Sequence, residues 1–248
     1  MATMQTNGSQ VMLDGGNKLP RLGLKESMVL LRGALDTTYF NKTARPMLYE
    51  KCGNNPYSAE MVHELVLETM HRNRNMAGFL SPFFMHKSSL IINVNGVEVV
   101  PFGTAAGMDK NGEALAVLGA IFGFQETGTV VLHPREGNKK PRVAVDNANL
   151  DIYNAQGFPS EGIYHFLKNV DDYRMGGGKA VLYVSICGLP LSREDAVETA
   201  NGEMGVLIAR IGAYANGLVW NPFSPNTDAL KLLRTPEVFY DTAQLMKD

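Results

Sequence analysis

The clearest helical pattern in the chain begins at Ser58, a residue type that favours the N-cap of a helix. Apolar residues then share one helical face at spacings of three and four, and they are Met61, Val62, Leu65, Val66 and Met70. Residues 75–85 follow as a turn or short helix rich in phenylalanine and methionine, broken by a glycine and a proline. Residues 1–45 lack such a pattern apart from an amphipathic stretch at 27–35, so we expect a loosely ordered lead-in there.

An Asn-Gly pair at 95–96 separates two runs of β-branched residues, which predicts a β-hairpin over residues 89–100. Strand and helix patterns alternate after it. Strands are expected near 102–106, 125–131, 180–186 and 217–222, and helices near 111–121, 160–170, 192–214 and 236–247. Ser192 and Asp195 have the spacing of a capping box. Strand-then-helix units in succession predict an α/β fold with a parallel sheet.

Composition narrows the function classes. The chain has 248 residues with 23 basic and 25 acidic side chains, so its net charge of −2 gives no general attraction for nucleic acid. Cys52 and Cys187 lie far apart and the histidines form no zinc-binding spacing, so we expect neither a disulfide framework nor a metal site. No apolar run reaches the roughly 18 residues of a membrane span, and the N-terminus lacks the pattern of a secretory signal.

Polar segments occur where the chemistry of an α/β protein is usually built, at the carboxyl ends of strands. The first is AAGMDKNGE at 105–113. Its small residues let a flat cofactor approach the backbone, and Lys110 can place positive charge beside a reducible ring or a carboxylate. An ordinary turn with a solvated lysine explains this segment equally well.

Three more segments follow. Gly128-Thr129 leads into PREGNKKPR at 134–142, and NAQGF occupies 154–158 in a hairpin-like stretch. The last, NPFSPNT at 221–227, places amides and a hydroxyl beside a strand end, which suits a polar, planar ligand because each amide offers a donor and an acceptor. Taken singly, each segment is also compatible with a polar loop or an Asn-Pro turn.

Together and in this order, the four segments resemble the dihydroorotate dehydrogenase family, and specifically its class 2, quinone-reducing branch. The family's pattern is AAG-x-DK-x-GE, then G-T/S-V-x-x-x-P-x-EGN-x-x-PR, then N-x-x-GF, then N-x-x-SPNT, and this chain carries all four at compatible spacing. The resemblance runs from about residue 45 to the C-terminus. It implies a partial (β/α)8 TIM-type barrel with a small N-terminal helical extension and a β-hairpin at the barrel base.

The resemblance implies FMN-dependent oxidation of dihydroorotate to orotate, with a quinone as electron acceptor, in pyrimidine biosynthesis. Ser224 matches the class 2 base that takes the C5 proton while the C6 hydride leaves for the flavin; class 1 has a cysteine there. Implied substrate contacts are Lys110, Asn154, Gly157, Phe158, Asn221 and Asn226. Implied cofactor contacts are Ala105, Ala106, Gly107, Lys110, Thr129, Asn154, Ser185 and Asn221. No metal is implied.

Some positions depart from the family's pattern. Ser185 stands where the family has an asparagine that touches the flavin, and its shorter side chain reaches less far. Val145 stands where the family has an arginine at the quinone pocket, which weakens the quinone assignment. Residues 130–133 read VVLH where V-T-P-K is usual, and Pro159-Ser160 replace two asparagines that are frequent in bacterial members.

The expected organisation is a lead-in at 1–45, a helical extension at 46–88 associated with membrane and quinone, and an incomplete FMN-binding barrel at 89–248. A closed barrel needs eight strands and roughly 250 residues, and its phosphate site usually follows strands 7 and 8. We therefore expect a barrel with an unpaired edge strand and without the residues that bind the cofactor phosphate. Two alternatives stay open: a non-catalytic half-barrel acting as an interaction module, and an FMN oxidoreductase for another cyclic amide with an altered 221–226 loop.

Residues 58–85 carry more large apolar side chains than so short a segment buries within itself, and they are Met61, Leu65, Met76, Phe79, Phe83 and Phe84. Packing on the barrel would account for them. The resemblance implies instead an extension that lies on a membrane surface and admits a lipid-soluble quinone. The expected location is peripheral, at a bacterial cytoplasmic membrane or a mitochondrial inner membrane.

Overall fold

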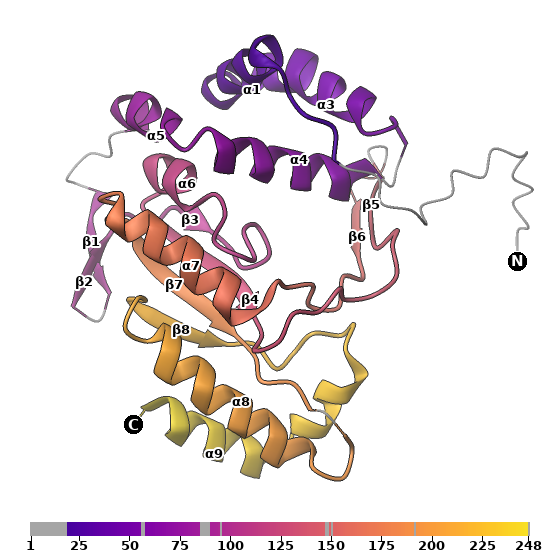
Figure 1. The fold of residues 1–248 in the computed structure, drawn as a ribbon, viewed down its shortest axis with the longest axis vertical. Coiled ribbons are helices and arrows are strands. Elements are labelled where there is room, and N and C mark those ends of the chain that lie inside the picture. The colour runs from indigo at the N-terminus through magenta and orange to yellow at the C-terminus, as the bar shows by residue number, and fades with distance from the viewer. Residues whose placement is uncertain are drawn as a thin grey trace, which may run out of the picture.

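The computed structural model describes residues 19–55, 58–84, 90–94, 96–146, 149, 151–190 and 192–247. A layer of helices from the N-terminal part of the chain lies across one end of a parallel sheet, and further helices flank that sheet (Figure 1). Short hairpins stand at the two ends of the sheet's strands.

The central sheet has four strands in the order β3-β4-β7-β8, and every neighbouring pair is parallel. The strands are β3 (Gly103–Thr104), β4 (Phe124–Val130), β7 (Val181–Ile186) and β8 (Gly217–Trp220). The helices that connect and follow them are α6 (Leu115–Ile121), α7 (Gly162–Met175), α8 (Ala196–Ile211) and α9 (Pro236–Lys247). The predicted succession of strands and helices is confirmed, and the sheet does not close into a barrel among the described residues.

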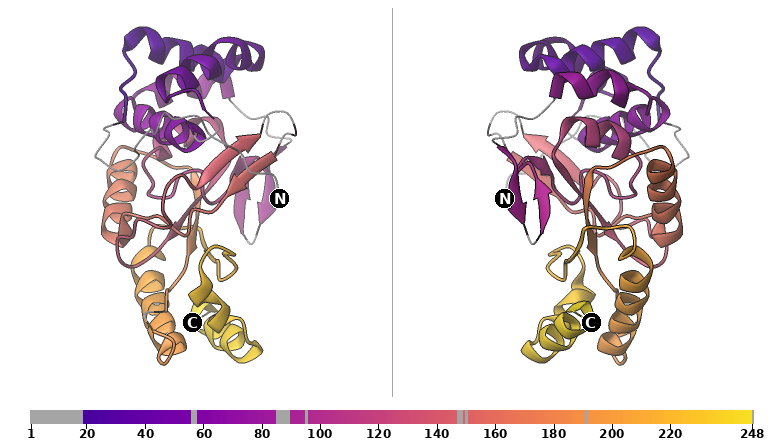
Figure 2. Two further views of the ribbon diagram at one scale, coloured as in Figure 1. Left: turned by 90° about the vertical axis from the view of Figure 1, so that its right-hand side faces the viewer. Right: turned by 90° about the vertical axis from the view of Figure 1, so that its left-hand side faces the viewer.

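The main hydrophobic core lies between the sheet and the helices on one of its faces. Leu182, Val184 and Ile186 alternate along β7 and are buried against Phe166 of α7 and Leu207 of α8. Figure 2 shows α7 and α8 on the same side of the sheet. The period of two in β7 therefore directs its aliphatic residues into this core.

The N-terminal helices form a second core. They are α1 (Leu24–Leu35), α2 (Thr37–Tyr39), the π-helix η1 (Phe40–Ala44), α3 (Arg45–Lys51) and α4 (Ser58–Arg72). Leu30, Leu48 and Leu65 are buried together there. Among the described residues, which start at Leu19, regular structure begins at Leu24. The expectation of a loosely ordered segment up to residue 45 is wrong over this part, because tertiary packing holds α1, whereas residues 1–18 lie outside the described residues.

Ser58 does not act as the expected N-cap. It is the first helical residue of α4, and its buried hydroxyl donates to the carbonyl of Cys52 at 2.7 Å while accepting from the backbone N–H of Asn55 at 3.2 Å. Ser192 is also not a helix cap. Its hydroxyl accepts from the backbone N–H of Asp195 at 3.0 Å, which closes a turn before α8 begins.

The segment after α4 exposes part of its apolar surface. It contains α5 (Met76–Leu80) and the 3-10 helix η2 (Ser81–Phe84). Leu65 and Leu80 are buried, whereas Phe79 and Phe83 are 55% and 60% exposed with ring centroids 5.5 Å apart. The prediction that these apolar side chains do not all pack inward is therefore confirmed for the two phenylalanines; Met85 lies outside the described residues.

The predicted hairpin is present as β1 (Ile92–Val94) paired antiparallel with β2 (Val97–Val99), and Gly96 has the positive φ of 84° that such a turn requires. A second antiparallel pair joins β5 (Val143–Asp146) to β6 (Asp151–Asn154), with Val145 opposite Ile152. The 3-10 helix η4 (Asp228–Leu233) precedes α9. No helix within the described ranges has the length and apolar character needed to cross a membrane.

Candidate functional site

The loop between β3 and α6 is held by its own backbone and by Asp109. The buried Asp109 carboxylate accepts from the backbone N–H groups of Glu113 at 2.9 Å and Ala114 at 2.8 Å. Burial raises the pKa of Asp109, although these backbone donors oppose the shift. Gly107 donates to the carbonyl of Gly128 at 2.7 Å, which ties the loop to the end of β4. Asp109 thus shapes the loop rather than facing a ligand.

Lys110 points back over this loop. Its ammonium group donates to the carbonyl of Gly107 at 3.0 Å. Burial lowers the pKa of Lys110 below its ordinary value, while the carboxylate of Glu60 favours the charged form. A cation that is largely removed from water at a strand end is available to an anionic or electron-rich ligand.

The polar segments converge on one cavity of about 260 Å³ at the carboxyl ends of the strands. Ten residues with an implied role line it, and they are Ala106, Gly107, Lys110, Thr129, Asn154, Gly157, Phe158, Asn221, Ser224 and Asn226. Ala105 and Ser185 are not among its lining residues. Residues from the four polar segments therefore meet at one mouth.

Ser185 reaches the cavity only through a neighbour. Its hydroxyl lies 2.9 Å from the Thr129 hydroxyl on the adjacent strand, and Thr129 accepts from the side-chain amide of Asn221 at 3.1 Å. Ser185 itself is buried. The shorter side chain at this position therefore supports Thr129, which sets the orientation of Asn221.

A second set of amides closes the other side of the cavity. The side-chain amide of Asn226 donates to the carbonyl of Asn154 at 3.2 Å, and Asn154 Oδ1 accepts from the backbone N–H of Gln156 at 3.0 Å. Asn138 bridges the two loops, because its side-chain amide donates to the carbonyls of Ala155 at 2.8 Å and Asn226 at 3.2 Å. Asn138 belongs to the segment PREGNKKPR, and its role as a bridge depends on contacts that the motif does not specify.

Helix α4 is attached to the same loops by polar contacts. His63 Nε2 lies 2.6 Å from the carbonyl of Met108. Burial, and then the charge of Lys110, lower the pKa of His63. Glu60 accepts from Arg142 at 2.7 Å, and each side chain is only 6% exposed. A hollow of about 920 Å³ lies between α4 and these loops.

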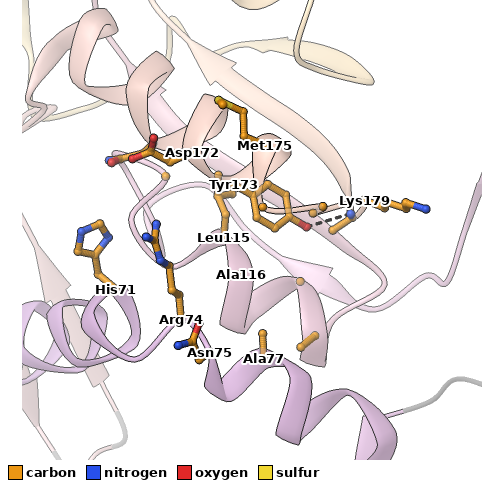
Figure 3. A pocket seen from close by; sticks show the side chains of 18 of the residues that line it. His71, Arg74, Asn75, Ala77, Leu115, Ala116, Asp172, Tyr173, Met175 and Lys179 are labelled. Carbon is orange, nitrogen blue, oxygen red and sulfur yellow. Dashed lines mark hydrogen bonds between the residues drawn. The ribbon is translucent and has the colours of Figure 1, made fainter.

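Another hollow of similar size lies elsewhere. It measures about 940 Å³ and is lined by residues of α4, α5, α6 and α7. Figure 3 shows His71 and Arg74 pointing toward Asp172 across it, with Tyr173 further along the wall. None of the residues with an implied role lines it. Volume alone therefore does not locate the site, and the convergence of motifs favours the smaller cavity.

Within the described ranges, no cluster of histidine, cysteine and carboxylate side chains could hold a metal ion.

Comparisons with known proteins agree with this reading of the motifs. Residues 89–247 match the family model described as dihydroorotate dehydrogenase. A protein of Baumannia cicadellinicola named dihydroorotate dehydrogenase (quinone) is 31% identical over 193 residues, which is 76% of this chain and 55% of that protein. A protein of the same name from Acinetobacter baylyi is 32% identical over 210 residues, or 82% of this chain and 57% of that protein.

A solved structure of DHODH from Eimeria tenella in complex with ferulenol aligns with a TM-score of 0.63 and 25% identity, covering 81% of this chain and 53% of that one. The chain thus spans a little over half the length of the curated relatives it matches. The sheet is accordingly part of the α/β barrel found in these neighbours. Since the family match extends over more than half of the residues, the chain belongs to the dihydroorotate dehydrogenase family.

Proposed function

We propose that this chain supplies the substrate-binding wall and the proton acceptor of an FMN-dependent dihydroorotate dehydrogenase that passes its electrons to a quinone. The convergence of Lys110, Thr129, Asn154 and Ser224 on one cavity carries the proposal. These residues come from segments that are far apart in the sequence, and packing of the parallel strands brings them to one mouth.

The residues at the mouth fit the ring of a flavin. Gly107 has a φ of +97° and open space where a side chain would begin, so a flat group can approach its backbone. Ala106, Lys110, Thr129 and Asn221 would hold the ring beside it. FMN, when bound, supplies a ring that accepts a hydride from the substrate. The cavity of about 260 Å³ lies just below the roughly 300–1,000 Å³ of typical ligand sites. It is therefore sized for the ring of FMN without the cofactor's phosphate-bearing chain.

The chain's own residues bind the substrate and accept a proton. Ser224 is half-buried in the cavity wall, and its Oγ would take the proton from C5 of dihydroorotate. A hydroxyl is a poor base in water, so it requires an enclosed site in which the proton can be passed on. Asn154 and Asn226 border the cavity with amide groups that match the polar edge of the substrate ring, and Lys110 attracts its carboxylate.

Ser224→Ala tests this assignment. With FMN in excess and oxygen removed, dihydroorotate should bleach the flavin absorbance in the parent chain, and the variant should be about 10²–10⁴-fold slower. Ser81→Ala is the matched control, because Ser81 is exposed in η2 and does not line the cavity. Equal rates in parent and Ser224→Ala would remove Ser224 from the mechanism, and a parent chain that never bleaches flavin would contradict the proposed function.

A non-catalytic half-barrel remains the second candidate. The observation that favours it is Ser185, which stands where the family has an asparagine that touches the flavin and which does not line the cavity. A half-barrel that serves as an interaction module would bind neither FMN nor orotate. Titration of the chain with orotate, followed through the fluorescence of its single tryptophan, Trp220, separates the two candidates, because saturable quenching supports the enzyme.

We further propose that the helical extension rests on a membrane surface. The exposed pair Phe79 and Phe83 supports this, as do Leu24 and Met28, which are 84% and 57% exposed on α1. Because the attachment is hydrophobic, it should survive moderate salt. Phe79→Ser with Phe83→Ser should reduce co-sedimentation with phosphatidylcholine vesicles, whereas Tyr240→Ser on α9 should not. Equal binding by both variants would exclude this surface.

A further inference from the structure

Arg234 lies just after η4 and reaches back to the segment that carries Ser224. Its Nε donates to the carbonyl of Pro222 at 3.2 Å, and one terminal nitrogen donates to the carbonyl of Ser224 at 3.1 Å. The guanidinium carbon also lies 5.6 Å from the centre of the Phe223 ring. One side chain therefore contacts three consecutive residues, and none of these contacts was foreseen from the motif.

The segment needs such an anchor. After β8 ends at Trp220, the backbone N–H of Asn221 still donates to Ile186 at 3.1 Å, and the chain then leaves the sheet. Pro222 and Pro225 have no N–H, so the segment cannot be held by a regular ladder of backbone bonds. Side-chain donors to its carbonyls therefore help to fix its path.

A guanidinium group suits this task. It is planar, permanently charged and carries several N–H donors in a fixed fork, so it can hold two carbonyls at once. Hydrogen bonds from a charged donor are roughly twice as strong as neutral ones. The backbone that carries Arg234 is itself held in place, because Leu230 and Leu233 of η4 are buried in a cluster with Val131 and Val238.

We propose that Arg234 is a positioning residue for Ser224. It fixes the carbonyl of Ser224 and the carbonyl two residues earlier, and so restricts where the Ser224 hydroxyl points into the cavity. Asn138 and Asn154 hold the end of the loop at Asn226. Arg234 therefore acts only on the part of the loop from Pro222 to Ser224. The inference rests on the proposed function for the role of Ser224, whereas the anchoring itself does not depend on it.

The anchoring can be measured without activity through Trp220, the only tryptophan in the chain. Its ring centroid lies 4.9 Å from that of Phe239, which in turn lies 5.5 Å from that of Phe223. Arg234→Ala should release Phe223 and raise the acrylamide quenching constant of Trp220 by about two-fold or more. Arg210→Gln is the control, since Arg210 is exposed at the end of α8. An unchanged constant in Arg234→Ala would overturn the anchoring.

The positioning role is measured by flavin reduction in the 248-residue chain with excess FMN. A misplacement of about 1 Å typically costs roughly 10²-fold in rate, so Arg234→Ala should lower the rate at saturating dihydroorotate by about that factor. The half-saturating concentration should change by less than about threefold, because Asn226 keeps its own anchors. Added guanidinium should restore part of the rate to Arg234→Ala, and Arg234→Lys should retain an intermediate rate.

The outcomes are separable. If the parent chain does not reduce flavin, the proposed function fails, and the Trp220 measurement still decides whether Arg234 anchors the segment. If quenching rises while the rate stays unchanged, or if guanidinium restores nothing, Arg234 does not position Ser224. Arg234→Lys guards against a general loss of folding, because a folded variant with an intermediate rate supports the positioning role.

Discussion

The buried pair of Glu60 and Arg142 should dominate the attachment of α4 to the barrel. Their side-chain atoms lie 2.7 Å apart, and each side chain is 6% exposed. Removing one partner of such a pair costs about 3–5 kcal/mol, because the other charge stays buried without compensation. In Glu60→Ala, Arg142 keeps the carbonyl of Asn138 at 3.2 Å and that of Glu136 as acceptors. We therefore expect the lower end, about 3 kcal/mol.

The stability lost in Glu60→Ala can be measured by thermal and urea unfolding. For a chain of this size, about 3 kcal/mol corresponds to a fall in Tm of roughly 6–12 °C. The pair of Lys168 and Asp172 on α7 is the control, because its side chains are 70% and 44% exposed at 2.8 Å. Lys168→Ala should cost less than about 1 kcal/mol.

A double variant isolates the charge effect. Replacing both Glu60 and Arg142 with methionine removes both charges and fills similar space, so it should recover most of the stability lost in Glu60→Ala. A loss in Glu60→Ala below about 1 kcal/mol would refute the reasoning, since it would mean that water compensates Arg142. A double variant as unstable as the sum of the single variants would refute it as well.

Two further predictions concern the mouth of the barrel. Gly128→Ala should destabilise the chain by more than about 1 kcal/mol in a urea titration, because its Cβ would clash with the carbonyl oxygen of Ser185 at a φ of +107°. Gly202→Ala in α8, where nothing lies within 4 Å of the added Cβ, should be neutral or stabilising, and equal effects of the two substitutions would contradict the prediction. The 248-residue chain expressed alone should bind FMN only weakly, so that flavin is reduced when FMN is in excess but is lost on gel filtration, because its described sheet has four strands and the phosphate site of such barrels follows strands 7 and 8. Gel filtration that yields a yellow protein with stoichiometric flavin would show the opposite.

Much of the architecture is local in origin and was therefore predictable. A strand was predicted near 180–186, and β7 lies there with Leu182, Val184 and Ile186 buried in the core at a period of two. The Asn-Gly pair specifies a turn through the backbone freedom of Gly96. The order of the polar segments also determined the family, since their spacing follows from successive strands reaching the same edge.

Other features depended on contacts that no local pattern encodes. Helix α1 lies in the part of the chain that was expected to be loosely ordered, and it is held there because Leu30 is buried together with Leu48 and Leu65. His63 meets Met108 across 45 positions, and Asn138 meets Asn226 across 88. Partners so distant in sequence are chosen by the packing of whole elements, so their roles could not be read from composition or spacing.

The sequence alone thus determined the α/β succession, the hairpin and the polar segments that line the cavity. Only the tertiary structure decided that Asp109 shapes its loop, that Ser185 acts through Thr129, and that Arg234 anchors the Ser224 segment. The physical reason is the same in each case. A hydrogen-bonding side chain is satisfied by whichever partner the fold brings within reach, and that partner is set by the packing of the core.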